Sequence, residues 1–227
     1  TGYRIIELAG IGPGPYAGQF LADMGAEVIV VERPGPERRT IDARGKKSII
    51  LDLRNPEGAK ALLALVAKAD VLFEGLRPGV TERLGIGPAE CHAVNPKLVY
   101  GRMTGWGQTG PWSQMAGHDI NYISMTGALN AIGRKDEVPV PPLNMVGDFG
   151  GGSMFLVAGI IAALLQAEKT GKGDIVDAAI IDGTHSLMSF IHGMAGAGLW
   201  NPGRENNLLD GAMPYYRCYR TADGKFV

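Results

Sequence analysis

Short apolar runs rich in β-branched residues alternate with longer segments along most of the chain. Six runs are short enough to be single strands, at residues 3–8, 27–32, 48–53, 70–74, 98–103 and 174–178. Most are separated by segments with helical spacing, and strands that alternate with helices form parallel sheets. The pattern therefore predicts an α/β fold, a parallel sheet with helices on both faces.

The clearest predicted helix begins after Asn55. Asn is a favoured N-cap, and Pro56 has the backbone angle of a first helical residue. We expect two more helices, one that opens near Asp148 and includes the apolar residues 154–165, and one that follows Asp182. Both are apolar on most faces, so they should be well buried.

The composition is that of an ordinary globular protein, with 227 residues, 45% hydrophobic and 20% charged. One domain is the default at this length. The apolar stretch 154–165 has 12 residues, too few to cross a membrane, and no basic and then apolar leader is visible at residue 1. We expect no membrane span and a cytoplasmic location, or a peroxisomal or mitochondrial one in a eukaryote.

Metal and disulfide chemistry has little support in the sequence. Cys91 and Cys218 lie far apart and have no CxxC spacing. His185 and His192 are seven residues apart on one face of a predicted helix, but further metal ligands are missing. We therefore expect neither a metal site nor a disulfide framework.

Charge is uneven along the chain, although the net charge of −1 argues against nucleic-acid binding. The segment 33–54 has three acidic side chains (Glu37, Asp42 and Asp52) and seven basic ones, namely Arg33, Arg38, Arg39, Arg44, Lys46, Lys47 and Arg54. Such an excess is either a solvated face or a binding surface for a small polyanion.

The turn after the first predicted strand resembles a dinucleotide-binding motif. Residues 12–17 fit G-x-G-x-x-A, and Glu32 lies 20 residues after Gly12. However, Pro13 and Pro15 remove backbone N–H groups from the turn that would bind a pyrophosphate. We interpret the glycines as a tight strand-to-helix turn and do not expect NAD.

Two side chains are candidates for acid–base chemistry. His118 lies ahead of a predicted short helix, in the loop-rich segment 105–142. Histidine is a base near neutral pH. Asp148 lies at the predicted start of a buried helix, where it could equally be a simple N-cap. His118 could likewise only bond a neighbouring backbone group.

The chain resembles α-methylacyl-CoA racemases of the family III CoA-transferase superfamily over nearly its whole length. The resemblance rests on ELAGIGPGP (7–15), VERP (31–34), RGKKSIILDLR (44–54), RPGVTERLGIGP (77–88), RMTGWGQTGP (102–111), GHDINY (117–122), PPLNMVGDFGGG (141–152), TGKGDIVDAAIIDG (170–183) and LLDGAMPYY (208–216). It implies a Rossmann-like large domain that binds CoA, which we place at 1–200. Residues 201–227 would begin the connection to a small domain beyond this chain, in an interlocked homodimer.

The resemblance leaves three functions open. As a racemase, the protein would interconvert (R)- and (S)-2-methylacyl-CoA thioesters through an enolate, with His118 and Asp148 serving opposite faces of the α-carbon. As a CoA transferase, it would use Asp148 as a nucleophile; such relatives lack the histidine before Asp119. The third alternative is an inactive CoA-binding fragment. The histidine favours the racemase, which needs no cofactor because CoA is part of the substrate.

An enolate also needs a hydrogen-bond donor, and one such donor contributes about 3–4 kcal/mol to a transition state. The candidate is the backbone N–H of Asp119. By resemblance, CoA and substrate contacts fall on Arg33, Leu51, Asp52, Leu53, Arg54, Leu76, Arg77, Arg83, Gly117, His118, Asp119, Ile120, Asn121 and Tyr122.

One residue departs from the family pattern, and one expected residue lies beyond this chain. Leu76 replaces a larger residue of some relatives. The Glu that orients the histidine in relatives is expected after Val227. The acyl group is left open, because Met103, Met115, Met125, Met145 and Met154 could form an adaptable apolar surface.

Overall fold

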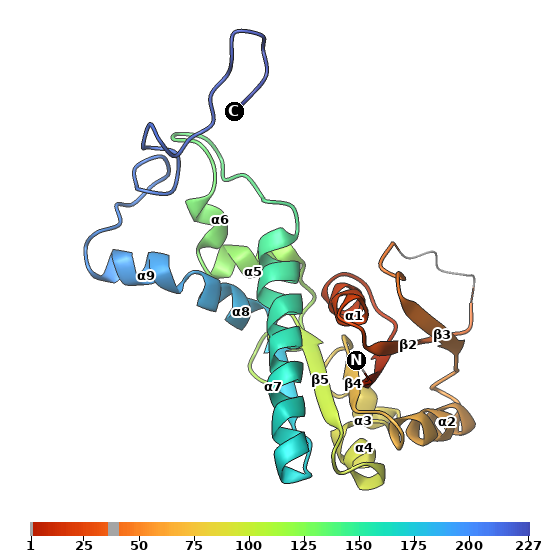
Figure 1. The fold of residues 1–227 in the computed structure, drawn as a ribbon. Helices are drawn as coiled ribbons and strands as arrows, with labels where there is room; N and C mark the ends of the chain where they lie inside the picture. Colours follow the sequence, from red (N-terminus) through yellow and green to blue (C-terminus); the bar gives the residue numbers. More distant parts are fainter. Residues whose placement is uncertain (1, 36–40) are drawn as a thin grey trace.

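A six-stranded parallel sheet forms the centre of the molecule (Figure 1). The computed structural model describes residues 2–35 and 41–227. The strands are β1 (Arg4–Leu8), β2 (Glu27–Glu32), β3 (Lys46–Ile50), β4 (Val71–Glu74), β5 (Val99–Thr104) and β6 (Ile175–Ala179). Their order is β3-β2-β1-β4-β5-β6, so the predicted α/β fold is confirmed. The third strand begins two residues before its predicted start at 48.

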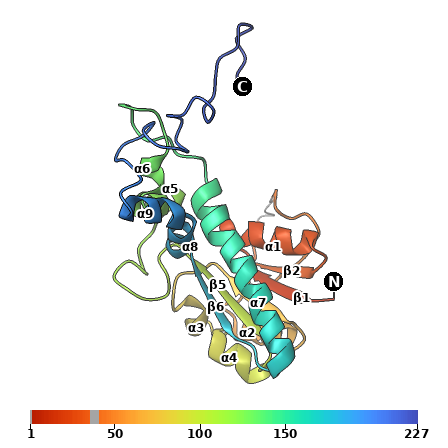
Figure 2. The ribbon, with the colours of Figure 1, turned by 60° about the vertical axis from the view of Figure 1, so that its left-hand side comes forward.

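Helices cover both faces of the sheet, as predicted (Figures 1 and 2). One face packs against α1 (Pro13–Asp23) and α7 (Phe155–Thr170), and the other packs against α2 (Pro56–Val66) and α4 (Pro88–Val94). Alternate strand residues divide between the two cores: Ile5 belongs to the first and Ile6 to the second. This division follows from the two-residue period of a strand, and it explains why these strands are apolar on both sides.

The predicted cap of α2 is confirmed. Asn55 has an extended backbone, and its side chain accepts a hydrogen bond of 3.0 Å from the Glu57 N–H. Pro56 is the first helical residue. The cap satisfies a donor that the helix itself cannot pair.

The helix predicted near Asp148 differs in kind from the expectation. It begins at Met145 as a π-helix, η1 (Met145–Met154), and becomes the α-helix α7 at Phe155. The glycines of η1 allow α8 to pack closely against it. A Cβ on Gly151 would lie 2.3 Å from the Thr184 hydroxyl. Apolar periodicity does not distinguish a π-turn from an α-turn. The next helix, α8 (Ile180–Leu187), begins slightly before the predicted Asp182 and leads into α9 (Ser189–Gly196).

The segment 105–142 was predicted to have one short helix, and this is wrong. It has α5 (Asp119–Met125) and α6 (Ala128–Ala131). Gly127 separates them, because its left-handed backbone (φ 80°) ends one helix and starts the next.

Beyond α9, the chain is irregular. Tyr219 and Val227 exchange backbone hydrogen bonds of 2.7 and 3.0 Å around a turn, as in a short hairpin. The division into a domain 1–200 and a connection 201–227 stays a prediction.

The helical run Met145–Thr170 is longer than the 12-residue apolar stretch suggested, because the glycine-rich η1 is also helical. It has 26 residues and a window of mean hydropathy 1.8, so it could cross a membrane by length and composition, although 44% of that window is buried. Because α7 packs against β5 and β6, it also fits a core helix. The absence of a membrane span stays a prediction.

Candidate active site

A cavity of about 390 Å³ lies at the carboxyl ends of β1, β4 and β5. Its lining includes Leu8 from β1, Gly75 just after β4, and Thr104 from β5. The chain crosses from one side of β1 to the other between β3 and β4, so this edge is the topological switch point of the sheet. Parallel α/β sheets bind ligands at this position.

His118 and Asp148, which are 30 residues apart in sequence, line this same cavity. His118 is the N-cap of α5, and its backbone N–H donates a hydrogen bond of 2.9 Å to the Asn121 side chain. That bond sets the backbone of His118 and leaves the imidazole exposed. The structure therefore brings the two predicted bases together.

Asp148 lies in η1 and is partly buried. Burial raises the pKa of its carboxyl group, and the negative charge of Asp119 raises it further. A hydrogen bond from Asn144 (3.4 Å) and the charge of His118 act in the opposite direction. Its backbone N–H donates to Asp119, so Asp148 is inside the π-helix and is not the simple N-cap considered from the sequence.

Tyr122 completes this side of the cavity. Its ring packs edge-on against Trp106 at a centroid distance of 4.8 Å. Burial, together with the charges of Asp148 and Asp119, raises the pKa of its hydroxyl to about 12. Gly105 and Gly117 have no room for a side chain, because a Cβ on either would lie within 3 Å of the Tyr122 ring.

The opposite side is the loop after β4, which a charge network holds in place. The Glu74 carboxylate accepts a hydrogen bond of 2.7 Å from the Leu76 N–H and lies 3.4 Å from the Arg102 guanidinium. Arg102 also forms an ion pair of 2.8 Å with Glu82 on α3 (Val80–Arg83). The sequence analysis missed these residues, although a Glu inside the apolar run VLFEG was a signal.

The residues expected to bind CoA follow the ends of neighbouring strands at this edge. Arg33 follows β2, residues 51–54 follow β3, and Leu76 and Arg77 follow β4. Of these, Leu76 and Arg77 line the cavity with His118. Arg38 and Arg39 of the predicted basic segment lie outside the described residues.

Several predicted side chains have a structural role as well. Leu51, Leu53 and Leu76 pack against the core between the sheet and α2. The guanidinium of Arg83 lies close to Gly79, where an added Cβ would be 3.2 Å away. Asp119, Ile120 and Asn121 are not among the cavity-lining residues, so the cavity gives these three predicted contacts no support.

The basic side chains of segment 33–54 have different environments in the structure. Lys46 forms a buried ion pair of 2.7 Å with Glu7, and Arg44 forms an exposed pair with Asp23. Neither is a free anion-binding group. Arg33 and Arg54 remain exposed at the strand-end edge.

The glycine motif after β1 forms the predicted tight turn. Gly12 has a positive φ of 71° and caps α1, which begins at Pro13. An added Cβ on Gly12 would lie 3.4 Å from the Asp148 carboxylate. The turn therefore packs against the site.

The predicted methionine surface is present in part. Met103 and Met115 line the cavity, whereas Met125 and Met145 are exposed at 54% and 56%.

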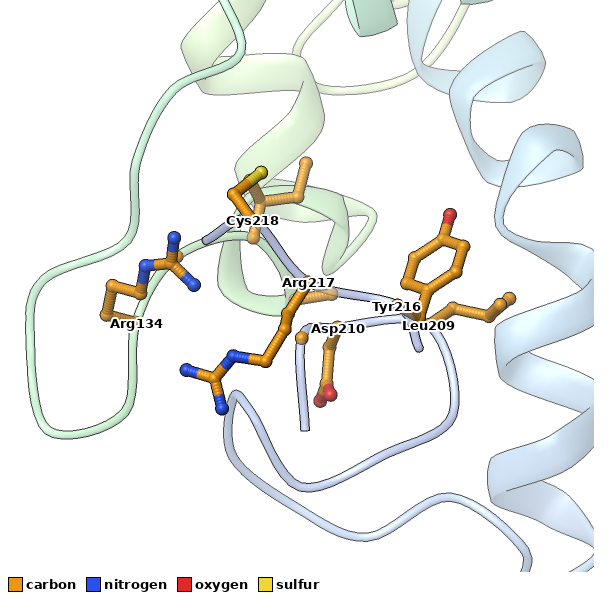
Figure 3. Close-up of a pocket in the computed structure, with 10 residues that line it drawn as sticks. Arg134, Leu209, Asp210, Tyr216, Arg217 and Cys218 are labelled. Carbon is orange, nitrogen blue, oxygen red and sulfur yellow. The ribbon is translucent and has the colours of Figure 1, made fainter. Parts of the chain in front are cut away.

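A second cavity, of about 420 Å³, lies away from these residues (Figure 3). Arg134 reaches it from the turn after α6, and Arg217 from the segment beyond α9. Both guanidinium groups pair with the Glu205 carboxylate. Cys218 is an exposed free cysteine that lines this cavity, and we assign it no chemistry.

The remaining histidines and cysteines provide no further site. The rings of His185 and His192 lie 4.7 Å apart, and His192 bonds the Thr126 carbonyl oxygen. No group of three metal-ligating side chains occurs within residues 2–35 and 41–227. Cys91 is buried, and burial raises its thiol pKa to about 12.

The fold and the cavity together define a Rossmann-like α/β domain with a histidine and an aspartate at its switch point. Residues 1–227 match the family described as CoA-transferase family III, and the chain belongs to that family.

Relatives of both reaction types resemble the chain. It is 46% identical to an alpha-methylacyl-CoA racemase from Mus musculus over 226 residues, which is 100% of this chain and 59% of the relative. It is 38% identical to a succinyl-CoA–D-citramalate CoA-transferase from Chloroflexus aurantiacus, with 98% of this chain and 59% of the relative covered. The chain therefore spans less than two thirds of the length of these relatives.

The fold also matches a solved structure. The crystal structure of a CAIB/BAIF family protein from Brucella suis has a TM-score of 0.86 at 31% identity, and covers 99% of this chain and 64% of that one.

Proposed function

We propose that the protein containing this chain is an acyl-CoA racemase that interconverts (R)- and (S)-2-methylacyl-CoA thioesters. The observation that carries the proposal is that His118 and Asp148 line one cavity at the switch point of the sheet. Similarity to the racemase from Mus musculus supports the substrate class.

In the proposed reaction, one base breaks the bond between the α-carbon and its hydrogen and takes the proton. The electron pair moves into an enolate, and the other group returns a proton to the opposite face. A base works best when its pKa lies near the working pH, so the raised pKa of Asp148 favours this role. Acid–base catalysis of this kind contributes about 10²- to 10⁴-fold.

The thioester oxygen needs a donor while the enolate exists. Asp119 is the first residue of α5, so its N–H lies outside the intrahelical hydrogen bonds. We assign this N–H to the enolate oxygen, and Arg77, with Leu76 beside it, to the CoA portion. Arginine matches phosphate geometry through paired donors. Arg33 and residues 51–54 would extend this surface, and the Glu expected beyond Val227 would orient His118.

The test is α-deuterium incorporation in D₂O by the complete protein, with a single-enantiomer 2-methylacyl-CoA. We expect incorporation with loss of optical purity, and loss of both in His118→Ala. His92→Ala on α4, a half-buried histidine outside the cavity, is the matched control.

A CoA transferase is the second candidate, because the relative from Chloroflexus aurantiacus has that name. In it, the Asp148 carboxylate would attack the thioester, the C–S bond would break, and CoA thiolate would leave an acyl anhydride on Asp148. CoA transfer to an added carboxylate without α-deuterium incorporation would establish this reaction instead. Tight CoA binding without either reaction would indicate a protein that only binds CoA.

A further inference from the structure

The side chain of Asp119 lies behind the cavity and touches the backbone that carries Asp148. It is 7% exposed and is not among the cavity-lining residues. Its Oδ2 accepts a hydrogen bond of 2.8 Å from the backbone N–H of Asp148. Asp119 also follows His118 directly. One residue is therefore attached to both proposed bases, to one by a peptide bond and to the other by a hydrogen bond.

The contact between Asp119 and η1 is tight. A Cβ on Gly147 would lie 2.4 Å from Asp119 Oδ2, so only glycine allows the η1 backbone to rest on this carboxylate. A hydrogen bond to an ionised acceptor is also stronger than a neutral one. The position of Asp148 therefore depends directly on the Asp119 side chain.

The other oxygen, Asp119 Oδ1, is buried and has no hydrogen-bond partner among the described residues. Leaving a buried polar group unpaired is unfavourable, and more so for a charged group. Serine or asparagine could accept the same N–H with a lower desolvation cost. Because burying the Asp119 carboxylate is unfavourable, its charge indicates a functional role.

We propose that Asp119 is a positioning residue for the proposed racemase reaction: its carboxylate holds η1 so that Asp148 faces the cavity, and it places one negative charge beside Asp148. The inference rests on the proposed function. It gives the Asp119 side chain a role separate from that of its backbone N–H.

The charges around Asp148 agree with this role. Burial and then Asp119 raise the pKa of Asp148, while His118 lowers it. The elements packed against η1 carry further titratable groups. On the helices these are Tyr16 and Asp23 (α1), Tyr122 (α5), Glu168 and Lys169 (α7), and Asp182 and His185 (α8). On the strands they are Tyr100 and Arg102 (β5) and Asp177 (β6). Of the carboxylates on these elements, Asp119 is the one whose charge raises the pKa of Asp148.

The test compares Asp119→Asn and Asp119→Ala in the complete protein. Asn keeps an oxygen for the Asp148 N–H but removes the charge, so we expect the Asp148 carboxyl to titrate at lower pH, followed by NMR of its side-chain carbon. The acid limb of the rate of α-deuterium incorporation should move by the same amount. Ala removes the hydrogen bond as well, and kcat should fall by up to about 10²-fold with little change in acyl-CoA affinity.

Asp182→Asn is the matched control, because it removes an exposed carboxylate from α8, which also packs on η1. Its Asp148 titration should not move. An unchanged Asp148 titration in Asp119→Asn, or full kcat in Asp119→Ala, would overturn the inference. If the wild-type protein incorporates no deuterium, the proposed function fails, but the NMR titration still tests the link between Asp119 and Asp148.

Discussion

The two sides of the cavity are built in different ways. On one side, η1 and α5 hold His118 and Asp148 through a backbone hydrogen bond and through glycines with no room for a side chain. On the other side, the loop after β4 is held by the nearly buried pair of Glu74 and Arg102, and Arg102 also pairs with the exposed Glu82. The first side positions reacting groups, and the second shapes the binding surface for a charged ligand.

Because the two sides are built differently, mutations should affect the reaction rate and the binding of acyl-CoA separately. Changes on the η1 side should lower kcat and leave the affinity for acyl-CoA unchanged. Changes on the β4 side should raise KM and leave kcat unchanged. Of the four predictions below, two test this division and two test how each side is held together, all on the complete protein.

The largest effect is expected for Asp148→Asn. The amide cannot accept the α-proton, so kcat should fall by about 10²- to 10⁴-fold. The dissociation constant of the acyl-CoA, measured by calorimetry, should stay within about twofold, because the CoA contacts lie elsewhere. A large loss of affinity with an unchanged kcat would show that the two sides of the cavity are not divided in this way.

A structural change behind η1 should come next. A Cβ on Gly183 would lie 1.9 Å from the Gly151 carbonyl oxygen, so Gly183→Ala must push α8 away from η1. We expect the free energy of unfolding to fall by about 1–3 kcal/mol, measured by denaturant titration, and kcat to fall with it. Gly193→Ala on α9 is the control, because nothing lies within 4 Å of its added Cβ. Equal stability of the two variants would contradict the packing argument.

A smaller effect is expected on the binding side. Arg77→Met keeps an unbranched apolar stem but loses the charged guanidinium, and a charged hydrogen bond contributes about 1.5–3 kcal/mol. We expect KM for acyl-CoA to rise by about 10- to 100-fold with kcat unchanged, in steady-state kinetics. Lys60→Met, on the exposed surface of α2, should leave both constants as they are. A fall in kcat without a change in KM would place Arg77 with the reacting groups instead.

The last prediction concerns the pH dependence of stability. Burial raises the pKa of Glu74 from its ordinary 4.5 to about 7, despite the Leu76 N–H and the Arg102 charge, which both lower it. Between these two values the folded protein binds more protons than the unfolded chain, so the free energy of unfolding should fall as pH rises.

Glu74→Gln should flatten that slope between about pH 4.5 and 7, as measured by urea unfolding at several pH values. Glu7, whose pKa is also raised to about 7 by burial, stays in both proteins, so the difference reports on Glu74 alone. Parallel curves for the two proteins would show that Glu74 titrates normally.

Much of the architecture could be predicted from local pattern. The six strands were predicted within three residues of their bounds, and the cap at Asn55 was confirmed. These features depend on apolar runs and on side chains that bond their own backbone, which are properties of neighbouring residues. The π-helix η1 could not be predicted, because its geometry depends on how closely α1, α5 and α8 approach its glycines.

The candidate site divides in the same manner. The sequence by itself determined that His118 and Asp148 were the candidate bases, and its motifs determined the family, because both depend on residue identity. Only the tertiary structure decided that they share a cavity with Arg77, and that Glu74 and Asp119 hold its two sides. These contacts join segments up to tens of residues apart, and burial and distance, which set the charge of a carboxyl group, exist only once the sheet has brought those segments together.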